Sequence, residues 1–177
     1  ELFRKSYLGH SNLAEATRFL ANELFGQYGL VILDADAAEL KRTLIPYIKD
    51  ELENQTSFKE VAATIEKLKE YSIQVNPREI NLFYIENDLR ERIIFENESY
   101  KVSHTDLSFS KEELFRLVET NPEKFSPNVI LRPLYQEVLL PNLCYIGGAG
   151  EIAYWLELQS FFKAAKVSFP MLLVRNS

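Results

Sequence analysis

The polar residues most suited to chemistry lie close together in the last third of the chain. Arg132 and Gln136 are four residues apart, so on a helix their side chains project from one face. A guanidinium group offers paired N–H donors that match a carboxylate or a phosphate. Arg132 is therefore the leading candidate for binding an anion. The competing interpretation is an ion pair with Glu137 or a hydrogen bond to a neighbouring carbonyl.

A glycine loop follows, between a predicted strand over residues 143–146 and a helix that Glu151 opens. Gly147 and Gly148 would let a ligand approach the backbone closely, and N–H groups at a helix start attract anions. Two glycines without a GxGxxG or Walker pattern also make an ordinary tight turn. Glu151 could hold an amine, with Tyr154 flanking the same ligand one turn further on. The alternatives are a carboxylate that stabilises the helix start and an aromatic core residue.

The other polar candidates favour a structural interpretation. Asn128, near a helix start, is expected to cap or turn the chain, with ligand contact as the alternative. Asp34 and Asp36 follow a predicted strand, where carboxylates could bind ribose hydroxyls or a metal, but Asp36 also suits a helix cap. The two histidines are far apart and Cys144 is the single cysteine, which gives no metal-ligand spacing. We therefore predict no metal site in this chain and leave open whether a longer protein needs one.

The elements that position these residues alternate between helix and strand at both ends of the chain. Apolar residues at helical spacing predict helices over about 13–25, 36–52, 57–71, 111–120, 126–139 and 151–162. Continuous or alternating apolar runs predict strands over about 30–33, 80–85, 92–95, 100–103 and 143–146, with a last one ending at 174. Asn12, Ser57, Ser110 and Ser126 are the predicted caps, and Pro46 should interrupt the second helix.

The predicted fold class is α/β with parallel strands. Two halves of one α/β layer are placed at 1–53 and 125–177, and residues 54–124 form an insertion with a β-hairpin. The segment 143–174 should be a βαβ unit with parallel strands and a right-handed crossover. Ligands in open α/β sheets bind beyond the carboxyl ends of the strands. If strand 30–33 shares this sheet, one rim would carry Asp34, Asp36, Gly147, Gly148, Arg175 and Asn176.

Composition excludes some classes of partner. The 177 residues carry 20 Lys and Arg against 26 Asp and Glu, a net charge of −6, which argues against nonspecific binding to nucleic acid or to an anionic membrane. No apolar run reaches about 18 residues, so no membrane span is expected. A single cysteine suits a reducing compartment, and we expect a cytoplasmic protein. The chain opens without methionine, so we expect an excised segment of a longer protein.

Several motifs in a fixed order point to a family. They are Gly29 to Asp34, Asn81 to Phe83, Ser126 to Gln136, Tyr145 to Gly148 and Glu151 to Trp155. On these residues the chain resembles the bacillithiol biosynthesis cysteine-adding enzymes, the cysteine ligases, over essentially its whole length. The family's histidine-and-acid motif and its coiled coil are not in these residues, so the chain resembles the middle third of such an enzyme.

The resemblance implies a Rossmann-like core, with residues 54–124 as a connecting-peptide-like subdomain similar to those of class I aminoacyl-tRNA synthetases. It implies a homodimer through the coiled coil and an ATP-dependent ligation of cysteine to glucosaminyl malate, the last step of bacillithiol synthesis. The segment alone is expected to be inactive. Arg132 and Glu151 are the expected catalytic residues, with a binding role for Asn128, Gln136, Gly147, Gly148 and Tyr154. The alternative is a noncatalytic binding or scaffold module of the same fold.

Overall fold

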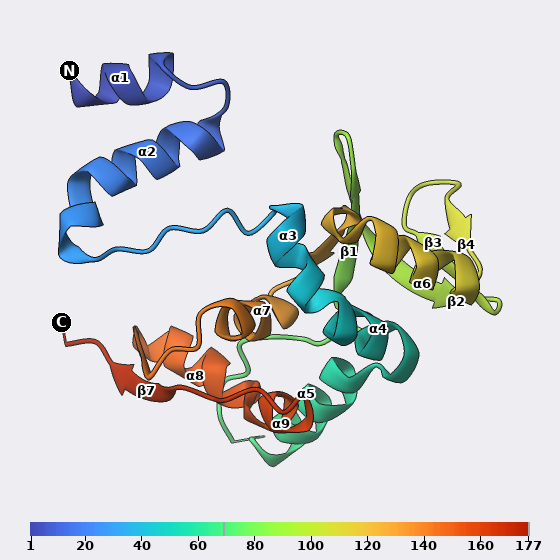
Figure 1. Ribbon diagram of the computed structural model, residues 1–177. Helices are drawn as coiled ribbons and strands as arrows, with labels where there is room; N and C mark the ends of the chain where they lie inside the picture. Colours follow the sequence, from blue (N-terminus) through green and yellow to red (C-terminus); the bar gives the residue numbers. More distant parts are fainter. Residues whose placement is uncertain (69, 177) are drawn as a thin grey trace. The chain divides into compact units, whose positions relative to one another are not determined.

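The computed structural model describes residues 1–68 and 70–176, which form two compact units that divide after Ala37 (Figure 1). The first unit holds helices α1 (Leu2–Leu8) and α2 (Leu13–Phe25) and a 3₁₀ turn (Gly26–Tyr28). The predicted cap of α2 is confirmed, because Asn12 Oδ1 accepts a hydrogen bond from the Glu15 N–H at 2.9 Å. The start of α2 is therefore determined by residues that are close together in the sequence.

The predicted strand over residues 30–33 is wrong. These residues are irregular, and the side chains of Leu30 and Val31 are 45% and 62% exposed. A continuous apolar run becomes a strand only where neighbouring strands pair with its backbone and cover its faces. No strand among the described residues pairs with this one. Asp34 instead makes a local turn, in which its Oδ1 accepts from the Asp36 N–H at 3.1 Å.

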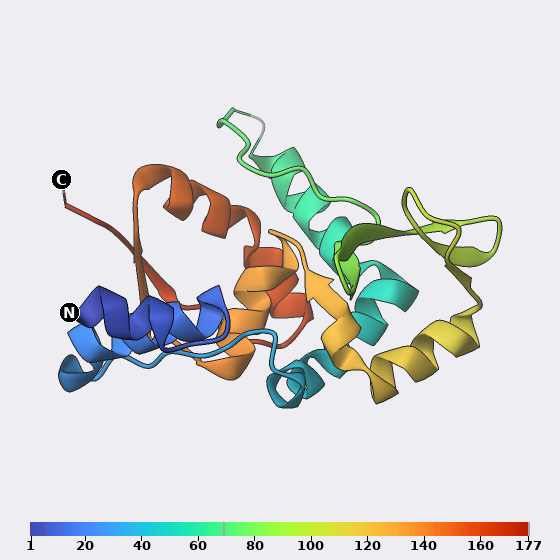
Figure 2. The same cartoon turned by 90° about the horizontal axis from the view of Figure 1, so that it is seen from above.

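The second unit opens with a helical run that breaks where proline predicts it. The run comprises α3 (Ala38–Lys41), a 3₁₀ turn (Arg42–Leu44) and α4 (Ile45–Asn54). Pro46 lies in the first turn of α4, where its missing N–H costs no hydrogen bond. Helix α5 (Thr56–Lys67) follows directly, and the irregular residues 72–81 lead into β1 (Figure 2).

The predicted capping role of Ser57 is wrong, because Ser57 lies inside the first turn of α5 and is fully buried. Its hydroxyl donates to Oε1 of Glu51 on α4 at 2.8 Å. Asn81, just before β1, donates to the same Oε1 through its N–H at 2.8 Å and its Nδ2 at 3.1 Å. Asn81 Nδ2 also donates to Ser57 Oγ at 2.7 Å. This buried polar network fastens α4 and α5 to the start of the sheet.

Glu51 should give the protein a distinctive pH dependence. Burial raises the pKa of Glu51 above its usual value of 4.5, so the folded state binds more protons at this site than an unfolded chain does. Its contribution to stability is then complete below about pH 4.5 and is lost as pH rises through the raised pKa. Urea unfolding of the full-length protein should show this loss, and Glu51→Gln should remove it. Equal pH slopes for wild type and variant would contradict the assignment.

A five-stranded antiparallel sheet forms the larger of two sheets, in the order β4-β3-β2-β1-β5. Its strands are β1 (Leu82–Glu86), β2 (Leu89–Glu96), β3 (Ser99–Val102), β4 (Ser108–Phe109) and β5 (Phe125–Pro127). The predicted hairpin is confirmed, with Asn87 in the left-handed region at φ 53° in its turn. The sequence did not predict β4 or β5, which are too short to show a pattern.

The predicted helix start at Ser126 is wrong. Ser126 lies in β5 opposite Phe83 of β1, and the helix α7 (Leu131–Leu139) begins five residues later. Asn128 provides the cap, since its Oδ1 accepts from the Ile130 N–H at 2.8 Å. Asn128 Nδ2 in turn donates to Asn81 Oδ1 at 2.8 Å, so the buried polar network also fixes the start of α7.

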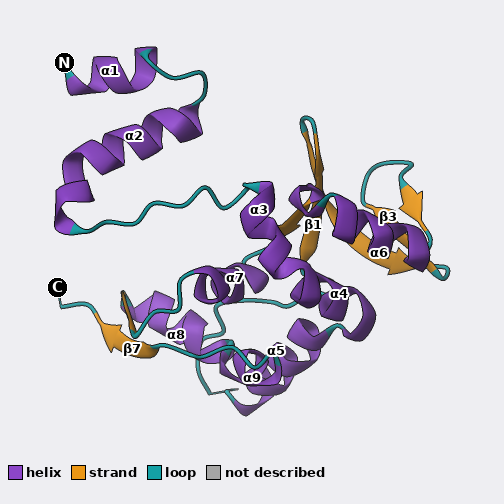
Figure 3. Cartoon of the chain, viewed as in Figure 1, coloured by secondary structure: helices purple, strands orange, loops and turns teal. Residues whose placement is uncertain are grey.

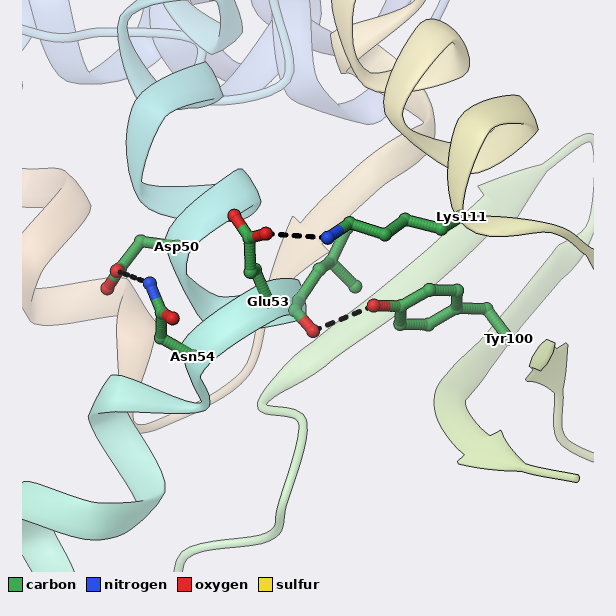
Figure 4. Close-up of polar contacts among 6 residues, drawn as sticks. Asp50, Glu53, Asn54, Tyr100 and Lys111 are labelled. Atoms are coloured by element: carbon green, nitrogen blue, oxygen red, sulfur yellow. Dashed lines mark hydrogen bonds and ion pairs between the residues drawn. The ribbon is translucent and has the colours of Figure 1, made fainter. Parts of the chain in front are cut away.

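Helix α6 (Lys111–Thr120) packs against β3 and β4 of the larger sheet and against α4. It begins at the predicted capping box, with both Ser110–Glu113 hydrogen bonds present at 2.8 and 3.2 Å. Figure 4 shows how the sheet and α6 are tied to the end of α4. Tyr100 donates its hydroxyl to the Leu52 carbonyl at 2.9 Å, and Lys111 pairs with Glu53 at 2.5 Å.

The C-terminal elements form the smaller, parallel sheet. Strands β6 (Cys144–Gly147) and β7 (Met171–Val174) pair in parallel, which confirms the expected parallel strands of this βαβ unit. Between them lie α8 (Ala149–Glu157) and α9 (Gln159–Ala164), which pack with the fully buried Trp155 and Phe162 in the core. Figure 3 shows the two groups of strands, with β3 beside α6 in one and β7 beside α8 in the other.

The second unit is therefore α/β with a mostly antiparallel sheet. The parallel strands of the expected core are represented, among the described residues, by β6 and β7. The expected ligand-binding rim, at the carboxyl ends of three parallel strands, is therefore formed by β6 and β7 without residues 30–33. The predicted boundaries at 53/54 and 124/125 stay a prediction.

Candidate functional site

Helix α7 carries the predicted pair of polar side chains on one face. Arg132 Nη1 donates to Gln136 Oε1 at 3.2 Å, as their spacing predicts. The hydroxyl of Tyr154 on α8 donates to the Val129 carbonyl, and the Arg132 guanidinium is near enough to act on the pKa of that hydroxyl. Burial raises the pKa of Tyr154 to about 12, so it stays a neutral phenol. Arg132 is exposed and keeps further N–H donors for a ligand.

The buried side chain of Glu137 contacts this pair through Gln136. It is 3% exposed, and its Oε1 accepts from Gln136 Nε2 at 3.2 Å. Both of its oxygens also accept from Asn142, Oε2 from the backbone N–H and Oε1 from Nδ2, each at 2.8 Å. The sequence suggested an ion pair between Glu137 and Arg132. In the structure, Gln136 stands between the two.

A second group of polar residues lies at the carboxyl ends of β6 and β7. Glu151, in the first turn of α8, accepts from the Gly148 N–H at 2.8 Å and from the Tyr145 hydroxyl at 3.3 Å. The hydrogen bond from Gly148 holds the pKa of the Glu151 carboxyl below its usual range, and the Arg175 guanidinium lowers it further. Glu151 is thus an anion at neutral pH. The Gly148 N–H, which the sequence offered to an anionic ligand, is occupied by this carboxylate.

The two groups adjoin through their tyrosines. Tyr145 is close enough to raise the pKa of Tyr154, and Tyr145 also stacks on Trp155 with 4.5 Å between ring centroids. Arg132 and Gln136 therefore lie on the Tyr154 side of these two tyrosines, and Glu151 lies on the Tyr145 side. The two sides offer a guanidinium cation and a carboxylate anion, which suits a substrate that carries both an acidic and an amino group.

Asn128, the remaining predicted binding residue, is used as the cap of α7 and as a partner of Asn81. Sequence reasoning did not identify Tyr145 as a site residue, although its place in a motif next to Gly147 was a usable signal. For Glu137, the sequence offered no sign of a role in the site other than its position next to Gln136. Across residues 1–68 and 70–176, no three His, Cys, Asp or Glu side chains gather closely enough to hold a metal. None of the described helices is long and apolar enough to cross a bilayer.

The two glycines of the loop should respond differently to substitution. A Cβ added to Gly147 would lie 2.9 Å from the Tyr145 ring and 3.1 Å from Glu151 Cβ, which forces a shift. A Cβ on Gly148 would meet nothing nearer than Glu151 Oε2 at 3.6 Å. We expect Gly147→Ala to cost about 1–3 kcal/mol and Gly148→Ala less than about 0.5 kcal/mol in urea unfolding. Equal losses would contradict the close approach at Gly147.

Comparison with known proteins shows the family of this chain. Residues 1–176 match the family model described as "Bacillithiol biosynthesis BshC, N-terminal Rossmann-like domain". A relative from Flavobacterium johnsoniae is 69% identical over 177 residues, covering 100% of this chain and 34% of the relative. One from Flavobacterium psychrophilum is 72% identical over 177 residues, covering 100% of this chain and 33% of the relative. One from Staphylococcus saprophyticus is 36% identical over 161 residues, covering 88% of this chain and 30% of the relative.

The fold and the match define a Rossmann-like α/β domain. The chain belongs to the BshC family of bacillithiol biosynthesis. The three relatives share the name "Putative cysteine ligase BshC", and the chain spans about a third of their length.

Proposed function

We propose that the full-length protein is an ATP-dependent ligase that joins cysteine to glucosaminyl malate in the last step of bacillithiol synthesis. The name of its relatives supports a cysteine ligase, and the bacillithiol family supports the pathway. The observation that carries the proposal is the exposed Arg132 guanidinium, which Gln136 orients on α7, together with the Glu151 carboxylate, which stays ionised at the start of α8. We further propose a cytoplasmic homodimer, in which this segment alone is inactive.

An amide ligase must hold a carboxylate, activate it and bring an amine to it. In this proposal Arg132 binds a substrate carboxylate and stabilises the negative charge that grows as the amine attacks. Glu151 holds the amine, because a carboxylate that stays ionised attracts an ammonium group. Gln136, Tyr154, Asn128 and the Gly147–Gly148 backbone line the same wall.

Activation is the role we propose for ATP. A free carboxylate does not react with an amine at neutral pH, and phosphoryl or adenylyl transfer would convert its oxygen into a leaving group. The residues of this chain fit part of that task. Arg132 and Arg175 are cations suited to a phosphate, whereas the loop N–H of Gly148 is engaged by Glu151.

A noncatalytic binding or scaffold module is the second candidate. The observation that favours it is that Asn128 and Glu151 each form a hydrogen bond at the start of a helix, Asn128 at α7 and Glu151 at α8. A scaffold would need those roles and no turnover.

The test is turnover by the purified full-length protein. Cysteine, glucosaminyl malate and MgATP are incubated with the protein, and bacillithiol is quantified by mass spectrometry beside the nucleotide products. We expect one ADP or AMP for each bacillithiol formed. If no bacillithiol forms above the protein-free control, the ligase proposal fails and the scaffold candidate gains.

A further inference from the structure

Glu137 is an acidic side chain in an unusual position. It is 3% exposed, and its carboxylate accepts hydrogen bonds from neutral N–H donors of Gln136 and Asn142. A buried carboxylate is costly unless hydrogen bonds compensate for the lost water. Two of its bonds close the turn after α7 through Asn142, and the third goes to a residue of the candidate site.

The third bond fixes the direction of the Gln136 amide. A carboxylate can only accept and a guanidinium can only donate, so Gln136 must point Nε2 at Glu137 and Oε1 at Arg132. The reversed amide would place oxygen against oxygen at one end and N–H against N–H at the other. Because Glu137 accepts from Gln136 Nε2, the Gln136 amide presents its oxygen, an acceptor, to the exposed guanidinium of Arg132.

The direction of the Gln136 amide in turn holds Arg132. Gln136 Oε1 accepts from Arg132 Nη1 at 3.2 Å. A guanidinium held in this way loses little further side-chain entropy when it binds an anion, because its rotamer is already set. The strength of anion binding then depends on a residue that the anion never touches.

We propose that Glu137 is a positioning residue, which orients the Arg132 guanidinium for the substrate carboxylate through the amide of Gln136. This inference rests on the proposed function, in which Arg132 binds that carboxylate. It assigns to Glu137 no contact with substrate.

The test compares Glu137→Gln with Glu137→Asp in the full-length protein. In Glu137→Gln, one of the two accepting oxygens becomes an N–H donor. The backbone N–H of Asn142 cannot reverse and needs the remaining oxygen, so the new N–H faces Gln136, turns its amide round and sets its N–H groups against Arg132. We expect the KM of the substrate bound by Arg132 to rise about tenfold, with kcat within about threefold. Glu137→Asp keeps an acceptor and should raise KM less. A purely structural role predicts the opposite order, since Gln preserves the packing and Asp leaves a gap.

Two controls separate the possible outcomes. Asn142→Ala removes a partner of Glu137 outside the site, and should lower the unfolding temperature without changing KM. In an Arg132→Ala background, Glu137→Gln should have no further effect on KM, because the group it positions is gone. If Arg132→Ala raises KM and Glu137→Gln does not, only the positioning role is overturned. If Arg132→Ala leaves KM and kcat unchanged, the proposed site itself fails.

Discussion

Arg132→Ala is expected to lower kcat/KM of the full-length protein for ligation about 100-fold. The variant loses two charge-assisted hydrogen bonds to the substrate carboxylate, together about 3 kcal/mol, and 1.4 kcal/mol corresponds to a factor of ten. Arg132 is exposed and its protein contacts are limited to one face, so the variant should fold normally. Steady-state kinetics with cysteine and glucosaminyl malate each varied in turn measure the loss.

Two comparisons make this result specific. Arg132→Lys should recover part of the activity, because an ammonium supplies the charge but not the paired donors. Arg116 is an exposed arginine on α6, and Arg116→Ala should leave kcat/KM unchanged. Normal activity of Arg132→Ala in a folded protein would remove Arg132 from the site.

Asn81→Ala is expected to lower the free energy of unfolding by about 3–5 kcal/mol. Its fully buried side chain donates to Ser57 Oγ and the Arg78 carbonyl, each at 2.7 Å, and to Glu51 at 3.1 Å. Its Oδ1 accepts from Asn128 Nδ2 at 2.8 Å. The truncation leaves several buried polar groups without partners, and each costs about 1–3 kcal/mol. Urea unfolding of the full-length protein measures the change.

The matched control is Asn76→Ala, in the irregular segment before β1, where the side chain is exposed and the expected change is below about 0.5 kcal/mol. Asn81→Asp adds a chemical test. It has the size of asparagine but sets an oxygen against the Glu51 carboxylate, so it should be destabilising at neutral pH and partly relieved in acid. A neutral effect of both Asn81 variants would show that the network does not hold α4, α5 and β1 together.

Locally encoded features were predicted from the sequence. The capping box of α6 needs only Ser110 and Glu113, and the hairpin turn needs only Asn87 in the left-handed region. Both signals lie within a few residues of the structure they produce. The break before α4 is of the same kind, because Pro46 fixes its own backbone geometry.

Features that depend on tertiary partners were not predicted. Residues 30–33 have the composition of a buried strand, but no described strand pairs with them. Ser126 has the side chain of a helix cap, yet its backbone pairs with Phe83 in the sheet. The Glu51–Asn81 contact joins residues thirty positions apart, for which the sequence offers no spacing rule.

In the candidate site, too, the local contact was predictable from the sequence and the contact that depends on packing was not. The spacing of Arg132 and Gln136 predicted correctly that the two side chains share one face of a helix. The contact between Gln136 and Glu137 was not predictable, because adjacent side chains on a helix normally point in different directions. Its significance depends on the burial of Glu137, which only the packed structure reveals.

The most direct test of the central claim is a crystal structure of the full-length protein with cysteine and glucosaminyl malate bound. We predict a substrate carboxylate oxygen at about 2.7–2.9 Å from an N–H donor of Arg132, with a substrate amine within hydrogen-bonding reach of Glu151. A carboxylate bound elsewhere, with Arg132 contacting only Gln136 and Tyr154, would contradict the account.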